Sequence, residues 1–213
     1  MKTLLYFVRH GQSLGNEGRI FLGHTDMGLT EMGFKQAKMT ADALADVKID
    51  LVYSSDLSRA YYTAVPHAEL RGLEVITDER LRELYCGEWE GLTVDQIIER
   101  YNSDYTDAWV NDFGRFTLPN GESVQHGADR MLEVALEVAR ANVGKTILLA
   151  SHAAVIRALW ARISGVAPED VAKNIPYPAN ASYSVAELVG DRLVPVSFSN
   201  DEHLGSLSTT WRD

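Results

Sequence analysis

Short apolar runs alternate along this chain with longer segments in which apolar residues recur every three or four positions. Residues 4–8, 51–53, 75–76 and 146–150 form runs of strand length. Unbroken runs of this kind are typical of strands that are buried on both faces of a parallel sheet. We therefore predict three buried strands at residues 4–8, 51–53 and 146–150, and a further short strand at residues 75–76.

The segments between these runs carry apolar residues at the spacing that places them on one face of a helix. Thr30 is expected to cap the first helix, Asp56 or Ser58 the second, and Gly165 with Pro168 to end the last. The four apolar faces are expected to comprise Phe34, Ala37, Ala41 and Leu44; Ala60, Ala64 and Ala68; Ala128, Met131, Leu132, Ala135, Val138 and Ala139; and Val155, Ile156, Leu159, Trp160 and Ile163.

The last part of the chain has the pattern of a β-hairpin. Residues 183–189 and 192–198 are two strand-like runs that are joined by Gly190-Asp191, and Pro195 places the second run at a sheet edge. The whole pattern predicts an α/β protein with three αβα layers around a mixed, mostly parallel sheet. We expect one domain covering residues 1–213.

The segment from about residue 93 to 122 departs from this alternation. It combines Tyr101, Tyr105, Trp109, Phe113 and Phe116 with several acidic residues, and Pro119-Asn120-Gly121 predicts a turn back into the sheet. Two interpretations remain open at this point. The segment is either a cap over a crevice or a small separate aromatic core.

Composition narrows the class of protein. The 213 residues carry a formal net charge of −10, which opposes binding to nucleic acid. The longest apolar runs fall short of the ~20 residues that span a bilayer, so no membrane partner is expected. Cys86 is the only cysteine, which excludes an intrachain disulfide and a cysteine-based zinc cluster. Met1 leads directly into the first predicted strand, so a cytoplasmic location is the default expectation. A monomer and a dimer suit the composition equally.

Two histidines follow the ends of predicted core strands. Arg9-His10-Gly11 comes directly after residues 4–8, and Ser151-His152 comes directly after residues 146–150. Because ligands of open α/β sheets bind beyond the carboxyl ends of the strands, we expect both histidines at one pocket.

Three kinds of catalytic site can be tested against these residues. A serine hydrolase of this architecture would need a Gly-x-Ser-x-Gly elbow, and the chain has none. A metal hydrolase would need clustered ligands, yet the six histidines are scattered and no His-Glu-x-x-His occurs. A histidine nucleophile toward phosphorus would need arginines for the phosphoryl oxygens and an acid for the leaving group. The chain contains all of these parts.

Further motifs follow in a fixed order along nearly the whole chain. They are Arg9-His10-Gly11-Gln12-Ser13 with Asn16; Leu29-Thr30 with Gly33 and Gln36-Ala37; Ser54-Ser55-Asp56-Leu57-Ser58-Arg59-Ala60 with Thr63-Ala64; Leu81-Arg82-Glu83 leading to Gly87-Glu88-Trp89-Glu90-Gly91; Gly121-Glu122-Ser123; Ser151-His152; and Asn200 with His203-Leu204. In this order the motifs resemble the histidine phosphatase superfamily, which includes the cofactor-dependent phosphoglycerate mutases.

The resemblance implies a role for each site residue. His10 would be the nucleophile that becomes phosphohistidine, and Glu83 the proton donor. The residues that would bind the phosphoryl group are Arg9, Arg59 and His152, with further contacts from Gln12 and Asn16. A nucleophilic His10 must be neutral, so we expect its other ring nitrogen to donate to a backbone carbonyl. A protonated His152 would add a donor, and Glu83 must keep a proton until the leaving group departs.

The resemblance covers both phosphatases and mutases. The family's glycerate mutases usually carry Glu-Arg-His-Tyr-Gly at the acid position, whereas this chain has Glu83-Leu84-Tyr85-Cys86-Gly87 and ends soon after the last predicted strand. We therefore expect a metal-independent phosphatase that acts on small phosphorylated metabolites of modest charge and needs no cofactor. The alternatives are a phosphoglycerate mutase, which would use 2,3-bisphosphoglycerate as cofactor, and a binding module for phosphate esters without activity.

One position departs from the family pattern. A glycine usually follows the second histidine, whereas Ala153-Ala154 follows His152 here. We expect that this position needs only a small side chain and not a positive φ.

Overall fold

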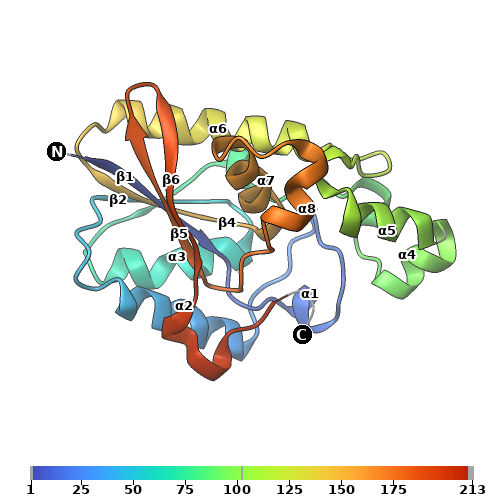
Figure 1. Cartoon of the computed structure of the whole chain (residues 1–213). Helices are drawn as coiled ribbons and strands as arrows, with labels where there is room; N and C mark the ends of the chain where they lie inside the picture. Colours follow the sequence, from blue (N-terminus) through green and yellow to red (C-terminus); the bar gives the residue numbers. More distant parts are fainter. Residues whose placement is uncertain (1, 102, 211–213) are drawn as a thin grey trace.

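The computed structural model describes residues 2–101 and 103–210. A six-stranded sheet in the order β3-β2-β4-β1-β5-β6 forms the centre of the molecule (Figure 1). Its strands are β1 (Thr3–Arg9), β2 (Leu51–Ser54), β3 (Val75–Thr77), β4 (Thr146–Ser151), β5 (Tyr183–Val189) and β6 (Arg192–Asn200). Strands β3, β2, β4 and β1 run parallel to one another. Strand β5 pairs antiparallel with β1, and β6 pairs antiparallel with β5. The predicted mixed and mostly parallel sheet is confirmed.

Helices cover both faces of this sheet (Figure 1). In Figure 1, α2 and α3 lie on one face, and α6 and α7 on the other. The helices are α1 (Leu14–Glu17), α2 (Glu31–Ala43), α3 (Ser58–Glu69), α4 (Val94–Tyr101), α5 (Ser103–Asn111), α6 (Val124–Ala141), α7 (Ala153–Ile163) and α8 (Val171–Asn174). Short 3₁₀ helices span Glu79–Leu81, Gly87–Trp89, Phe113–Arg115, Pro168–Asp170 and Glu202–Leu207. The three-layer αβα architecture is as predicted.

The register between β1 and β4 places the two sequence motifs side by side. Arg9 pairs with Ser151 in the parallel ladder, and the backbone N–H of His10 donates to the Ser151 carbonyl at 3.0 Å. His10 and His152 therefore leave the same edge of the sheet from adjacent strands, which is the arrangement expected from the sequence.

Two details of the predicted helices are wrong. The N-cap of α3 is Leu57, without a side-chain cap, because Asp56 is held by an ion pair with Arg82 and Ser58 is already the first helical residue. Phe34 is about half exposed on α2, whereas Ala37 and Ala41 are fully buried. The buried face of α2 is centred on Gly33 and Ala37, and Phe34 lies at its margin, where the ring packs against Tyr62.

The aromatic segment between residues 93 and 122 folds as α4, α5 and a 3₁₀ turn, which extend from one side of the sheet (Figure 1). Trp109, Phe113 and Phe116 pack into the same core as the residues of the sheet. The segment is thus not a separate aromatic core, and Trp109 also lines the pocket described below. The side chain of Tyr105 lies outside the described residues.

His67 is a buried titratable group of α3. Its side chain is fully buried, and neither ring nitrogen has a hydrogen-bond partner within the described residues. Burial, with smaller contributions from Arg71 and His203, lowers the pKa of His67 from 6.5 to about 3. The folded protein therefore keeps this ring neutral at pH values where the unfolded chain protonates it.

This difference predicts a pH-dependent loss of stability. Between pH 6.5 and about 3 the unfolded state binds more protons at His67, so the free energy of unfolding falls as the pH falls through this range. The slope from one such group approaches about 1.4 kcal/mol per pH unit. His67→Leu fills a similar volume without a titratable group, and urea denaturation at several pH values should show a flatter profile below pH 6. Parallel profiles for the two proteins would contradict this account.

Candidate active site

His10 lies at the end of β1 and is almost fully buried. Its Nδ1 is 2.7 Å from the carbonyl oxygen of Gly11, and because a carbonyl can only accept, Nδ1 carries the proton. The Nε2 atom of a neutral ring is then left with its lone pair. The carbonyl partner that the sequence analysis anticipated is thus supplied by the next residue of the chain.

The loop that follows His10 is fixed by a close backbone approach. A Cβ atom on Gly11 would lie 2.4 Å from the carbonyl oxygen of Gly33 in the first turn of α2. The backbone N–H of Gly11 also donates to Thr63 Oγ1 of α3 at 3.0 Å. The carbonyl that orients the His10 ring is therefore held by contacts with two helices.

Two buried guanidinium groups flank this ring. Arg9 and Arg59 are 2% and 1% exposed, and neither forms an ion pair with a carboxylate in the part of the chain that the structure describes. They donate instead to backbone carbonyls: Arg9 to Pro178 at 2.6 Å, and Arg59 to Gly23 at 2.8 Å and Thr25 at 3.0 Å. Two buried cations without a buried counter-charge make a strong site for an anion.

The buried charges also act on the histidines. Burial first, and then the charges of Arg59 and Arg9, lower the pKa of His10 well below 6.5. Burial lowers the pKa of Arg9 as well, to about 10, which leaves this side chain charged at neutral pH. At neutral pH the site therefore combines two cations with a neutral imidazole.

His152 is the N-cap residue of α7 and is fully buried beside His10, with the two ring centroids 5.2 Å apart. Its Nε2 shares a hydrogen bond with Ser55 Oγ at 2.9 Å, while its Nδ1 has no partner among residues 2–101 and 103–210. Burial and the charge of Arg59 lower its pKa well below 6.5. A protonated His152 was predicted from the sequence, whereas the structure favours the neutral ring, which still has one N–H to donate.

Glu83 lines one pocket together with Arg9, His10 and Arg59, and it lies against the first turn of α7. Its Oε1 accepts from the backbone N–H groups of Leu84 and Val155, both at 3.0 Å, and its Oε2 accepts from that of Ala154 at 3.1 Å. The carboxyl group is thereby fixed at the positive end of the helix. Ala153 begins α7 and is not among the residues with positive φ, so the alanine in place of glycine causes no backbone strain.

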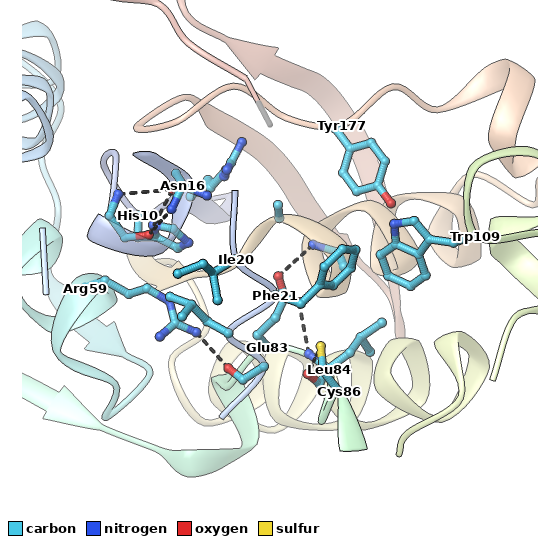
Figure 2. Close-up of a pocket in the computed structure, with 16 residues that line it drawn as sticks. His10, Asn16, Ile20, Phe21, Arg59, Glu83, Leu84, Cys86, Trp109 and Tyr177 are labelled. Atoms are coloured by element: carbon cyan, nitrogen blue, oxygen red, sulfur yellow. Dashed lines mark hydrogen bonds between the residues drawn. The ribbon is translucent and has the colours of Figure 1, made fainter. Parts of the chain in front are cut away.

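The two further polar residues differ in position. Asn16 lines the pocket, and its Oδ1 accepts from Ser13 and from Asn180 Nδ2, which leaves its amide nitrogen as the donor (Figure 2). Gln12 does not line the pocket. Its side-chain oxygen accepts from Thr30 Oγ1 at 2.8 Å, and its backbone N–H donates to Gln36.

The structure also reveals lining residues that the sequence analysis did not single out. Figure 2 shows His10, Asn16 and Arg59 toward one end of the pocket, and Trp109 and Tyr177 toward the other. The further lining residues without a predicted role are Ser13, Ile20, Phe21, Leu22, Gly23, Leu84 and Cys86. Apolar residues of this kind have the same pattern in the sequence as core residues, so no sequence signal distinguished them.

Arg130 of α6 was also missed, although it organises the loop that carries Glu83. Its guanidinium donates to the carbonyls of Arg80 at 2.7 Å, Arg82 at 3.0 Å and Glu83 at 3.3 Å. It also forms a two-point ion pair with Glu122, whose side chain is only 8% exposed. A single side chain therefore holds three backbone carbonyls within the four residues that end at Glu83.

Removing this side chain is expected to loosen the loop. Arg130→Ala removes the cation that pairs with a nearly buried carboxylate and the donor to three carbonyls, so we expect the free energy of unfolding to fall by about 3 kcal/mol. Amide hydrogen exchange at Leu84 and Tyr85 should become faster. Urea denaturation and exchange measurements test both effects.

Arg162→Ala is the matched control for Arg130→Ala. Arg162 pairs with Asp129 on the surface, where both side chains are more than half exposed. Its removal should cost less than about 1 kcal/mol. Equal losses in the two variants would show that Arg130 does not have the structural role described.

Residues 5–201 match the family described as histidine phosphatase superfamily (branch 1). The chain is 34% identical over 202 residues to phosphoserine phosphatase 1 of Hydrogenobacter thermophilus, covering 94% of each chain. It is also 33% identical over 200 residues to a 2,3-bisphosphoglycerate-dependent phosphoglycerate mutase of Brucella canis, covering 87% of this chain and 97% of the mutase.

Solved structures agree with the family match. A mycobacterial glucosyl-3-phosphoglycerate phosphatase in complex with VO3 superposes with a TM-score of 0.86 at 31% identity, covering 93% of this chain and 99% of that one. Bacillus stearothermophilus YhfR superposes with a TM-score of 0.89 at 28% identity, covering 95% and 99%. Sequence motifs, fold and comparisons lead to the same conclusion: the chain belongs to the histidine phosphatase superfamily.

Proposed function

We propose that this protein is a metal-independent phosphatase that hydrolyses small phosphomonoesters through a phosphohistidine on His10. The observation that carries this proposal is the neutral His10 ring between the two buried cations Arg9 and Arg59. A phosphoryl group supplies the negative charge that the two guanidiniums lack, and their planar donor groups match its oxygens. The phosphatase names among the relatives support the same activity.

The first step transfers the phosphoryl group to the protein. The lone pair of His10 Nε2 attacks phosphorus while the bond from phosphorus to the ester oxygen breaks, and Glu83 gives its proton to the departing alkoxide. Because Nδ1 keeps its proton against the Gly11 carbonyl, the ring carries a positive charge in the intermediate, which is offset by the phosphoryl oxygens. Arg9, Arg59 and a His152 N–H stabilise the charge on those oxygens.

The second step releases phosphate. The Glu83 carboxylate accepts a proton from water, whose oxygen attacks phosphorus as the bond from phosphorus to Nε2 breaks. The ring then leaves as the neutral imidazole that began the cycle. The N–H groups that hold both Glu83 oxygens keep the carboxyl group in place through both steps.

Metal independence is supported by the side chains themselves. Across residues 2–101 and 103–210, no three side chains of His, Cys, Asp or Glu come together as metal ligands. Arg9 and Arg59 supply the positive charge with which a metal ion would otherwise neutralise phosphate. No helix of the described chain is long and apolar enough to cross a membrane.

Mutase activity is the alternative, because relatives of both kinds match the chain. A mutase must hold a bisphosphate and a phosphorylated product, which places a second phosphate in the outer part of the site. Arg9 and Arg59 are the only lysines or arginines among the described lining residues. The absence of a second pair of cations from this lining favours hydrolysis over mutase activity.

Trapping the phosphorylated protein tests the central step. The wild-type protein is mixed with a 32P-labelled phosphomonoester in EDTA and quenched in alkali, in which phosphohistidine survives. We expect one labelled site, on His10, and no label on His10→Ala. His126→Ala, which removes an exposed histidine, should label as the wild type does. Turnover that persists in His10→Ala, or that EDTA abolishes, would refute the proposal.

The role of Glu83 as proton donor is tested by changing the leaving group. Glu83→Gln keeps an acceptor oxygen for α7 but has no acidic proton, so kcat/KM for an alkyl phosphate should fall by about 100-fold or more. The loss should be much smaller for 4-nitrophenyl phosphate, whose phenolate leaves without a proton. Equal losses for the two esters would assign Glu83 a role other than acid catalysis.

A further inference from the structure

The outer part of the pocket is apolar. Beyond His10, Arg9 and Arg59, its wall consists chiefly of Ile20, Phe21, Leu22, Leu84, Trp109 and Tyr177. Figure 2 shows Ile20 between the Arg59 end and the aromatic end, where Trp109 and Tyr177 lie together. The alcohol part of a bound ester must lie along this wall, because the polar end is taken by the phosphoryl group.

This wall is a fixed surface. The Trp109 ring packs edge to face with Phe21 at 5.8 Å and with Phe113 at 5.0 Å, and only 8% of Trp109 is exposed. Rings held in this way offer a preformed surface for an apolar ligand and do not need to rearrange.

Within residues 2–101 and 103–210, the wall lacks a cation for a charged alcohol. Both lining arginines flank His10, where they lower its pKa, and both are tied to backbone carbonyls. Arg157 lies near Tyr177, but its guanidinium stacks on the rings of Tyr177 and Phe113 at 4.2 and 4.4 Å and does not line the pocket. A carboxylate in the alcohol part would lose its water against apolar side chains and would also lie near Glu83.

On the basis of the proposed function, we propose that this pocket selects phosphomonoesters of uncharged, apolar alcohols and discriminates against esters that carry a carboxylate or a second phosphate. The ring or chain of the alcohol contacts Trp109 and Tyr177. This class excludes phosphoserine and 3-phosphoglycerate as preferred substrates, since both carry a carboxylate. The protein then differs in specificity from the relatives that are named for phosphoserine and for glucosyl-3-phosphoglycerate.

A matched pair of esters tests the selection directly. The first ester, 3-phenylpropyl phosphate, has an uncharged alcohol, and the second, 3-(4-carboxyphenyl)propyl phosphate, adds one carboxylate far from the ester oxygen. Because the two alcohols have nearly equal acidity, the chemical step is the same and the ratio of kcat/KM reports contact with the wall. We expect the wild-type protein to favour the uncharged ester at least ~10-fold.

The outcomes distinguish the proposed specificity from the proposed phosphatase activity. Equal rates, or a preference for the carboxylate, phosphoserine or 3-phosphoglycerate, would overturn the specificity while leaving the phosphatase activity established. Absence of phosphate release from these esters and from 4-nitrophenyl phosphate would overturn both. A ratio that favours the uncharged ester supports the proposed selection.

A charge introduced into the wall gives a second test. Ile20 is half-buried and lines the pocket, so Ile20→Lys should lower the preference for the uncharged ester at least ~10-fold. Val143→Lys is the matched control, because Val143 is 72% exposed in the turn before β4, at the opposite end of that strand from His152. The control should keep the wild-type ratio. An unchanged ratio in a folded Ile20→Lys protein would place the alcohol elsewhere and overturn the proposal.

Discussion

The parallel pairing of β1 with β4 is the constraint on which the site depends. The Arg9–Ser151 register brings the ends of both strands to one edge, so two histidines that are 142 positions apart become neighbours, with ring centroids 5.2 Å apart. Each strand then leads into a structure that completes the arrangement. The turn after β1 supplies the carbonyl that orients His10, and the start of α7 supplies the N–H groups that hold Glu83. A shift of one residue in this register would change the position of His10 relative to His152.

The electrostatics of the site follow from burial. Folding removes Arg9 and Arg59 from water without giving either a carboxylate partner among the described residues, and this costs stability. The same loss of hydration favours the binding of an anion, because a phosphoryl group replaces the interactions with water that the guanidiniums lost. The depressed pKa values of His10 and His152 have the same origin, since a ring among buried cations cannot gain a charge at low cost. Stability and chemical function are thus opposed in this part of the molecule.

Much of this arrangement was predictable, and the failures have physical causes. Unbroken apolar runs located the strands, and the motifs around His10, Arg59, Glu83 and His152 named residues that do meet in space. The cap of α3 was wrong because the tertiary ion pair of Asp56 with Arg82 overrides the local preference of Asp56 for a capping position. The apolar lining of the pocket could not be predicted, because Phe21 and Trp109 have the sequence pattern of core residues. In the structure both residues belong to the core and also line the pocket. Arg130 was not found, because its partners other than Glu122 are backbone carbonyls, which every residue possesses.

The double position of Trp109 limits how the specificity of this protein can evolve. A mutation of Trp109 that reshapes the pocket also removes a large side chain from the core. Variants that acquire a new substrate through this residue are therefore less stable. Ile20 and Tyr177 face the same pocket from connecting segments and are only partly buried, so they change at lower cost. Mutations that change the specificity for the alcohol should therefore accumulate first in these two segments, while Trp109 stays unchanged.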